Sequence, residues 1–336
     1  MRGYVPQLWA RSEVSTPPLE SRGSVGLSAP ATPLVAILLC TKNGSRFLPE
    51  QLNSIASQTH TNWKIFASDD GSTDATLSTL LQFAELHTAR VLLRDGPRQG
   101  FTKNFLSLAA DPTISADYFA YCDQDDIWHD EKLTRAVTWL QRIPNEIPAL
   151  YGTRVTIIDE LGRTRGRSTL FQRMPSFENA LVQSIAGGNT MVFNRSAKRL
   201  IERAGTLDVV AHDWWTYILT SAAGGAVHYD PDVSVKYRQH GSNLIGSNAG
   251  LSANLQRLKA LLADGYRKWN ATNIAALDRC IDLIDPRHRV TLSMFKRARL
   301  QSNLSQRLLF LRKSGIYRQT VLGNLGLIAS AALRKL

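Results

Sequence analysis

The sequence predicts an α/β fold in which a mostly parallel, twisted sheet is flanked by helices and followed by a helical C-terminal extension. Apolar runs alternate with helical patterns between residues 34 and 148, and the first run is unbroken, as in a parallel strand buried on both faces. Short polar turns join these elements, which is typical of βα units. After residue 245, basic residues are interleaved among leucines, a composition that indicates helices.

The individual elements follow in chain order. Strands are predicted at residues 34–40, 64–68, 90–94, 118–122, 149–158, 189–194, 226–229 and 234–237. Helices are predicted at residues 48–58, from about 74 onward, at 102–110, through Leu133, Val137 and Leu140, and at 212–223. A hairpin is predicted at 159–162 and an arginine-rich loop after it, and 241–250 has the Gly, Ser and Asn content of a linker or mobile loop.

The net charge of +12 is concentrated at one end of the chain. Residues 246–336 hold 16 basic and 4 acidic residues, whereas residues 1–245 hold 24 of each. With 43% hydrophobic residues the chain can bury a large core, which excludes a disordered or fibrous protein. A neutral body with a basic end predicts attraction of that end to an anionic surface.

Three widely separated cysteines, Cys40, Cys122 and Cys280, are too few for a disulfide framework and form no CxxC pair. We therefore expect a reducing cytosolic setting and no structural zinc. Residues 1–33 lack the apolar core of a secretory signal and are expected to form a disordered leader. No apolar run reaches about 18 residues, so no helix is expected to span a bilayer.

Polar side chains follow the predicted strands at the edge where open α/β sheets bind ligands. Thr41 and Asn43 follow the first strand, and Asp69 and Asp70 follow the second. Asp and Asn are common in turns and helix caps, so local capping is an alternative for any one of these turns. No GxGxxG follows the first strand and no GxxxxGK[ST] occurs, which disfavours a Rossmann dinucleotide site and a P-loop.

The segment YCDQDDIW at 121–128 is more specific. Its carboxylates at Asp123, Asp125 and Asp126 repel one another unless a cation or water screens them. A hard divalent ion held by one or two carboxylates and a substrate diphosphate relieves that repulsion. Asp123 and Asp125 face the same way in extended backbone, which suits one shared ion. The alternative is a solvated acidic turn with Trp128 in the core.

A series of segments resembles the family 2 glycosyltransferases, which are inverting enzymes with a GT-A fold. The segments are VAILLCTKNG (35–44), LNSIASQ (52–58), SDDGSTD (68–74), DQDDIW (123–128), GGNTM (187–191), HDWW (212–215) and YRQHGSN (237–243). Within the family, three of them are most similar to rhamnosyltransferases that build bacterial surface polysaccharides. The resemblance implies a catalytic domain at 34–245, with a nucleotide-sugar-binding part at 34–148 and an acceptor-binding part at 149–245, before the basic helical region at 246–336.

The resemblance also implies roles by position. The donor-binding residues would be Thr41, Asn43, Asp70 and Asp123. Asp125 would be the metal ligand, beside Asp123, for Mn²⁺ or Mg²⁺. Asp213 occupies the position of the general base, which takes the proton of the acceptor hydroxyl. Many members have Glu where this chain has His212, and a Glu there would raise the pKa of Asp213 by like-charge repulsion.

Six further residues are candidates for contacts with the donor, the metal or the acceptor, and for each the alternative is an ordinary structural role. For the donor they are Lys103, Asn104 and Arg238; for the metal, His240; for the acceptor, Trp214 and Trp215. Arg238 suits a diphosphate because a guanidinium binds phosphate strongly. Trp214 and Trp215 belong either to the core or to a surface on which the sugar stacks. Spacing alone favours Asp213 as a first-turn residue that gains from the helix dipole, and the order of the motifs reverses that preference.

Two apolar stretches at 304–311 and 320–333 lie among basic residues, which predicts an element that binds an anionic membrane surface. Helical packing on the body is the alternative. We expect an enzyme attached peripherally to the inner, cytoplasmic face of the cell membrane.

The expected reaction moves a sugar from a nucleotide-diphosphate donor to a growing, lipid-linked surface glycan. The resemblance suggests L-rhamnose from dTDP-L-rhamnose. A sugar nucleotidyltransferase is one competing prediction, and a non-enzymatic basic protein that binds membrane or nucleic acid is another. Nucleic acid is disfavoured, because residues 246–336 have few aromatics and no RNP or zinc-finger pattern.

Overall fold

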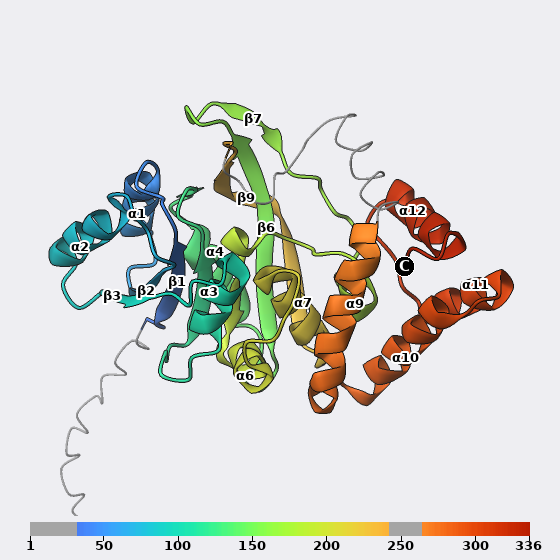
Figure 1. Cartoon of the computed structure of the whole chain (residues 1–336). Coiled ribbons are helices and arrows are strands. Elements are labelled where there is room, and N and C mark those ends of the chain that lie inside the picture. The colour runs from blue at the N-terminus through green and yellow to red at the C-terminus, as the bar shows by residue number, and fades with distance from the viewer. Residues whose placement is uncertain (1–31, 242–263) are drawn as a thin grey trace, which may run out of the picture. The chain divides into compact units, whose positions relative to one another are not determined.

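A single mixed sheet runs through the described part of the chain and carries helices on both faces (Figure 1). The structure is a computed structural model that describes residues 32–241 and 264–336. The predicted leader at 1–33 and linker at 241–250 therefore lie almost entirely outside the described residues. Pro33–Leu336 belongs to one structural unit, so the C-terminal helices are part of the same body as the sheet.

The strands pair in the order β3-β2-β1-β4-β8-β6-β9-β5, and β7 pairs with β6. They are β1 (Val35–Thr41), β2 (Trp63–Asp69), β3 (Val91–Asp95), β4 (Tyr118–Cys122), β5 (Ile127–Trp128), β6 (Ala149–Ile158), β7 (Thr164–Arg167), β8 (Val192–Asn194) and β9 (Ala226–Arg238). The first four are parallel, β8 is antiparallel to β4 and β6, and β6 is parallel to β9. The predicted α/β class is confirmed, and the sheet is parallel in its N-terminal half and mixed beyond it.

Helices follow most strands of the first half and then form the C-terminal region. They are α1 (Leu48–Ala56), α2 (Thr76–Leu86), α3 (Phe101–Ala109), α4 (Lys132–Leu140), α5 (Phe177–Ala180), α6 (Arg195–Ala204), α7 (His212–Ala222), α9 (Asp264–Arg279), α10 (Pro286–Leu300), α11 (Leu304–Lys313) and α12 (Val321–Ala332). Short 3₁₀ turns lie at Gly188–Thr190 and Ile281–Leu283. The predicted βα units between residues 34 and 140 are confirmed with small shifts of their ends.

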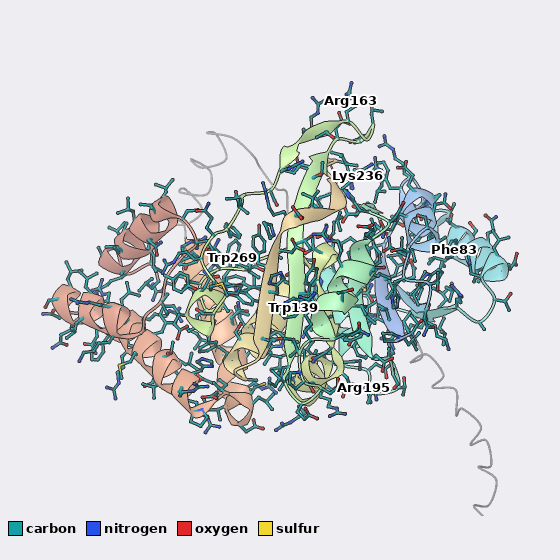
Figure 2. All side chains as sticks on the ribbon, turned by 180° about the vertical axis from the view of Figure 1, so that it is seen from behind. Phe83, Trp139, Arg163, Arg195, Lys236 and Trp269 are labelled. Atoms are coloured by element: carbon teal, nitrogen blue, oxygen red, sulfur yellow. The ribbon has the colours of Figure 1, made fainter. Side chains whose placement is uncertain are left out.

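The predictions for the second half need correction. The strands predicted at 226–229 and 234–237 are one strand, β9, which crosses register shifts opposite Arg154 while Pro231 lies within it. The arginine-rich loop contains β7, which forms the predicted hairpin with β6; Figure 2 shows Arg163 at its tip. The strand predicted at 189–194 begins as a 3₁₀ turn. Helix α6 was not predicted, although Asn194 caps it by accepting from Ala197 N.

The two faces of the sheet carry separate hydrophobic clusters. Val35, Ile37 and Leu39 of β1 pack on the face covered by α1, α2 and α4, and the residues between them pack on the opposite face. That opposite cluster continues into α7, α9 and α10. Trp214 of this cluster meets the partly exposed Trp269 of α9 edge to face, with ring centroids 6.5 Å apart. Trp269 is labelled in Figure 2. One side of the C-terminal region thus packs on the body.

The register of the parallel strands assembles the site. β1 pairs with β2 as far as Thr41 opposite Asp69, and with β4 as far as Leu39 opposite Cys122. The turns after these strands therefore leave the sheet at one edge. The acidic segment that begins at Asp123 meets the loop after Thr41 there.

Candidate functional site

A cleft of about 1480 Å³ lies at the carboxyl ends of β1, β2 and β4. Its walls also include residues 183–189, the start of α7, the end of β9 and the start of α12. The predicted site residues on its surface are Thr41, Asn43, Asp70, Asn104, Asp123, Asp125, Asp213 and His240. The structure thus brings together residues that are up to about 200 positions apart in the sequence.

Asp69 holds together the turn that follows β2, next to the cleft-lining residues Thr41 and Asp70. Its carboxylate accepts hydrogen bonds from Thr41 Oγ1 at 2.7 Å and from the backbone N–H groups of Ser72 at 2.7 Å and Gly71 at 3.1 Å. Burial raises the pKa of Asp69, but these hydrogen bonds outweigh it and hold the pKa below its usual range. Gly71 has φ of 84°, which a side chain would strain. Asp69 is therefore an ionised organiser of the turn.

Asp70 joins that turn to the loop after β3. Its carboxylate accepts from the backbone N–H groups of Arg98 at 2.5 Å and Gly100 at 3.1 Å. Asn104, at the start of α3, exchanges two hydrogen bonds with Ser68 at 2.6 and 3.0 Å. These two predicted donor residues are fixed by the protein and still line the cleft.

The loop after β1 is held from two sides. Asn43, in the left-handed region with φ of 48°, accepts from Thr73 N at 2.8 Å. Gln124 accepts from Lys42 N at 2.8 Å and donates to Lys42 O at 3.0 Å. A Cβ atom on Gly44 would lie 2.1 Å from Gln124 Oε1, so a side chain at position 44 would displace the Gln124 amide from this position. Gln124 had no role in the sequence interpretation.

The acidic segment gives its cleft-lining carboxylates distinct surroundings. The carboxylate of Asp123 has no hydrogen-bond partner among the described residues. Burial, together with the charges of Asp126, Asp125 and Asp213, raises its pKa well above the usual range. Asp125 Oδ2 lies 2.8 Å from His240 Nε2. Carboxylates are therefore crowded around Asp123, and Asp125 has the imidazole of His240 as a neighbour.

Asp126 has a structural position behind the cleft. It is fully buried and accepts from Asn189 Nδ2 at 2.5 Å and Arg238 N at 3.0 Å. The guanidinium of Arg238 donates to Asp125 O at 3.0 Å and to Glu50 at 2.7 Å. Asp126 and Arg238 thus tie the acidic segment to β9, and Arg238 is not among the residues that line the cleft.

We expect Asp126→Ala to lower the free energy of unfolding by about 2–4 kcal/mol, because it leaves two buried donors without an acceptor. Asp126→Asn keeps an acceptor for Arg238 N and should lose less. Asp125→Ala, at the cleft surface, should change stability by less than about 1 kcal/mol. Urea denaturation of the three variants measures this; equal stability of Asp126→Ala and wild type would contradict the structural role.

Asp213 lies in the first turn of α7. Its Oδ2 accepts from Gly188 N at 3.0 Å and its Oδ1 from Trp214 N at 2.6 Å. Burial raises its pKa, and these backbone donors only partly oppose the rise. Its charge contributes to the raised pKa of Asp123, so the two carboxylates face a common space. Ala211, and not Asp213, is the N-cap of this helix.

His212 is an uncharged neighbour of Asp213. It is 4% exposed and stacks on Phe105 with ring centroids 3.9 Å apart. Neither ring nitrogen has a partner within the described residues, and burial lowers its pKa to about 3. A Cβ atom on Gly188 would lie 2.7 Å from His212 Nε2. The ring therefore fills space beside Asp213 without adding charge.

We expect His212→Glu to move the acidic limb of the pH profile of kcat/KM to higher pH by about one unit. A Glu carboxylate beside Asp213 disfavours ionisation of Asp213, so the base gains its working charge only at higher pH. His212→Gln, with the same length and no charge, should leave the limb where it is. Identical profiles for the Glu and Gln variants would contradict electrostatic contact between positions 212 and 213.

Other predicted residues do not reach the cleft surface. The ammonium of Lys103 pairs with Asp208 at 2.6 Å, outside the cleft. Trp214 is buried and donates from its indole to Ala180 O at 2.7 Å, and Trp215 is fully buried. A buried indole offers no face to a sugar, so both tryptophans are core residues in this structure.

The cleft also holds residues that the sequence interpretation did not assign. Those from the first half are Lys42, Arg46, Phe47, Arg98 and Gln124, and those from the C-terminal region are Arg318, Thr320, Leu322 and Gly323. Arg98 lies in the glycine-bounded turn at 96–100, which was a usable signal. The residues from the C-terminal region had no signal in the sequence, because their position in the cleft depends on how α12 packs against the rest of the chain.

The cleft carboxylates suit a hard divalent cation. Within the described ranges, no three His, Cys, Asp or Glu side chains are grouped so that they could hold a metal ion by themselves. Asp123 and Asp125 nevertheless offer oxygen ligands, and the crowding that raises the pKa of Asp123 is relieved by a cation. A substrate diphosphate could complete the coordination.

The fold is similar to that of S. aureus TarS 1–349, whose structure is solved in complex with UDP-GlcNAc. The TM-score is 0.50 at 13% identity, over 84% of this chain and 92% of that chain. The mixed sheet with helices on both faces is the GT-A fold. Residues 36–201 match the family described as Glycosyl transferase family 2, and this chain is a glycosyltransferase with a family 2 domain.

Two curated relatives extend the similarity beyond that domain. The dTDP-rhamnosyl transferase RfbG of Shigella flexneri is 29% identical over 70% of this chain and 83% of its own length. An uncharacterized glycosyltransferase of Haemophilus influenzae is 28% identical over 62% of this chain and 67% of its own. The predicted resemblance to family 2 glycosyltransferases is confirmed.

Proposed function

We propose that this enzyme transfers a sugar from a nucleoside-diphosphate donor to a hydroxyl group of a growing glycan, with inversion at the anomeric carbon. The observation that carries the proposal is the position of Asp213 in the same cleft as Asp123 and Asp125. Direct displacement needs a general base for the acceptor hydroxyl. It also needs carboxylates that can hold a metal ion at the leaving diphosphate.

Asp213 is the general base in this proposal. Its raised pKa makes it a stronger base than an ordinary Asp, and the N–H groups of Gly188 and Trp214 hold its carboxylate in place. It takes the proton of the acceptor hydroxyl as that oxygen bonds to the anomeric carbon. The bond from this carbon to the diphosphate breaks on the opposite side, which inverts the configuration.

Asp123 and Asp125 would hold Mn²⁺ or Mg²⁺, with His240 beside Asp125. When bound, the metal neutralises charge on the departing diphosphate. In this proposal Asp70, Thr41 and Asn43 orient the nucleotide part of the donor without help from the metal. Asp70 accepts from two backbone N–H groups and still has free lone pairs for a pyrimidine N3–H. In this proposal the base binds there, near Thr41 and Asn43.

The donor that we propose is dTDP-L-rhamnose, supported by the name of the Shigella relative and by the motif similarity. The acceptor would be a lipid-linked surface glycan of the cell envelope. The enzyme would then work at the cytoplasmic face of the membrane, and the basic region at 246–336 favours such a location.

Thermal unfolding with a panel of nucleotide sugars tests the proposal. A donor that binds the folded state at 100 times its Kd stabilises it by about 2.7 kcal/mol, so the Tm should rise. We expect the largest rise with dTDP-L-rhamnose and Mn²⁺ or Mg²⁺, and a smaller one with EDTA. No rise with any nucleotide sugar and metal would contradict the proposed function, and a larger rise with another sugar would contradict the donor.

A further inference from the structure

Helix α12 is apolar on both sides. Val321–Ala332 contains no charged residue, and its buried side, which includes Leu327 and Ala331, packs on the body. The other side is open: Val321 is 79%, Leu325 58% and Ile328 51% exposed. These three positions follow a spacing of four and three residues, which forms one continuous stripe on a helix. We call them the α12 stripe.

A helix without a polar face is normally buried in a core or in lipid. Exposed apolar stripes of this kind mark binding surfaces. At 1.5 Å per residue, a 12-residue helix is about 18 Å long, against about 30 Å for the hydrocarbon core of a bilayer. Within the described ranges, no helix has the length and hydropathy needed to cross a membrane. The α12 stripe therefore suits contact along a surface.

Hydrogen bonds connect α12 to α11 and the segment before α12 to the cleft wall. The buried guanidinium of Arg307 donates to Ala331 O at 2.6 Å, in the last turn of the helix. Before the first turn, Gln319 N donates to Gln183 Oε1 at 2.9 Å, and Gln183 itself lines the cleft. The exposure of the stripe is thus a property of a fixed element.

The first turn of α12 is also the rim of the cleft. Thr320, Leu322 and Gly323 line it, and Leu322 is at the same time an exposed large apolar residue. An apolar surface therefore runs from the cleft rim along the helix. Whatever binds the α12 stripe lies beside the entrance used by a substrate.

The charge around α12 selects one kind of partner. The chain has no Asp or Glu after Asp285. Exposed cations precede and follow the helix at Arg312, Lys313 and Arg334. Apolar side chains flanked by Lys and Arg complement an anionic lipid surface, in which acyl chains lie beneath negative headgroups.

We propose that the α12 stripe is the membrane-contact surface of this enzyme, that it lies in the headgroup region of an anionic bilayer, and that it holds the cleft rim at the lipid. The proposed lipid contact rests only on the exposed apolar side chains of α12 and the cations around it. The orientation rests on the proposed transfer to a lipid-linked acceptor, which would enter the cleft past Leu322.

Flotation with vesicles tests the lipid contact without any donor. The full chain should float with phosphatidylcholine vesicles that contain phosphatidylglycerol, and less with pure phosphatidylcholine or at high salt. Leu325→Glu/Ile328→Glu should weaken binding on the order of 100-fold, because two apolar side chains can no longer be buried. The matched control is Leu86→Glu/Leu161→Glu, at leucines that are 81% and 72% exposed elsewhere, and it should bind as wild type does.

Thermal unfolding and gel filtration complete this test. The α12 variant should unfold near the wild-type Tm, since it changes only exposed residues. Equal flotation of the α12 variant and wild type would overturn the proposal. So would a wild-type dimer that the α12 variant converts to a monomer, because the stripe would then bind a second copy of the chain.

Site-specific fluorescence tests the orientation. The three native cysteines are buried, so a cysteine introduced at an exposed site can be labelled selectively. A polarity-sensitive dye on Leu325→Cys and on Leu322→Cys should shift to the blue on anionic vesicles, and the same dye on Leu86→Cys should not. A shift at 325 without one at 322 would overturn the placement of the rim at the lipid. None of these outcomes depends on whether the enzyme transfers a sugar.

Discussion

Asp213→Asn is expected to lower kcat by about 10³–10⁴-fold, because an amide cannot accept the proton of the acceptor hydroxyl. The loss in stability should be only about 1 kcal/mol, since one of the two backbone donors, Gly188 N or Trp214 N, would still find a carbonyl oxygen. Release of nucleoside diphosphate, measured with saturating donor and acceptor, reports the rate.

A matched control distinguishes the base from a general effect of lost charge. Asp208 is exposed, lies five residues before Asp213 and pairs with Lys103 outside the cleft. Asp208→Asn should retain near wild-type activity. Substantial activity in Asp213→Asn would remove Asp213 from the proposed mechanism.

Asp125→Ala is expected to lower kcat/KM by about 10³-fold, which corresponds to about 4 kcal/mol of lost transition-state stabilisation. The physical reason is loss of a carboxylate that would hold the metal at the leaving diphosphate. The variant should also lose the metal-dependent part of the Tm rise with donor, a readout that does not require turnover.

Asp95→Ala provides the comparison, because Asp95 is an exposed carboxylate at the end of β3 that does not line the cleft. It should keep both activity and the metal-dependent Tm rise. If Asp125→Ala kept the metal response, the proposed ligand would have to be sought elsewhere in the acidic segment.

The sequence predicted the N-terminal half of the fold well because its strands are buried on both faces. The apolar run at 34–40 has the length and composition of a central parallel strand, and it appears as β1. β9 was divided wrongly because Pro231 normally ends a strand, whereas here a bulged register accommodates it. α6 was missed because its apolar face is short, although Asn194 supplied a cap signal.

The cleft was predicted where carboxylates follow strands directly, as at Asp70 and Asp123. The position of a side chain could not be predicted where it depends on contacts with residues far away in the sequence. Arg238 binds Glu50 across 188 positions and lies behind the cleft, although a guanidinium near the site suggested a phosphate contact. The position of α12 at the cleft rim could not be predicted for the same reason, since it depends on contacts with distant parts of the chain.

The paired hydrogen bonds between Gln124 and the main chain of Lys42 have a kinetic consequence. The pairing of β1 with β4 ends with Leu39 opposite Cys122. Beyond that point the Gln124 side-chain amide makes two further hydrogen bonds to the Lys42 main chain, as a neighbouring strand would. Solvent deuterium should therefore replace the amide proton of Lys42 slowly, although the residue is exposed. The two loops that meet there should open as a single cooperative unit, so that the cleft floor behaves as an extension of the sheet.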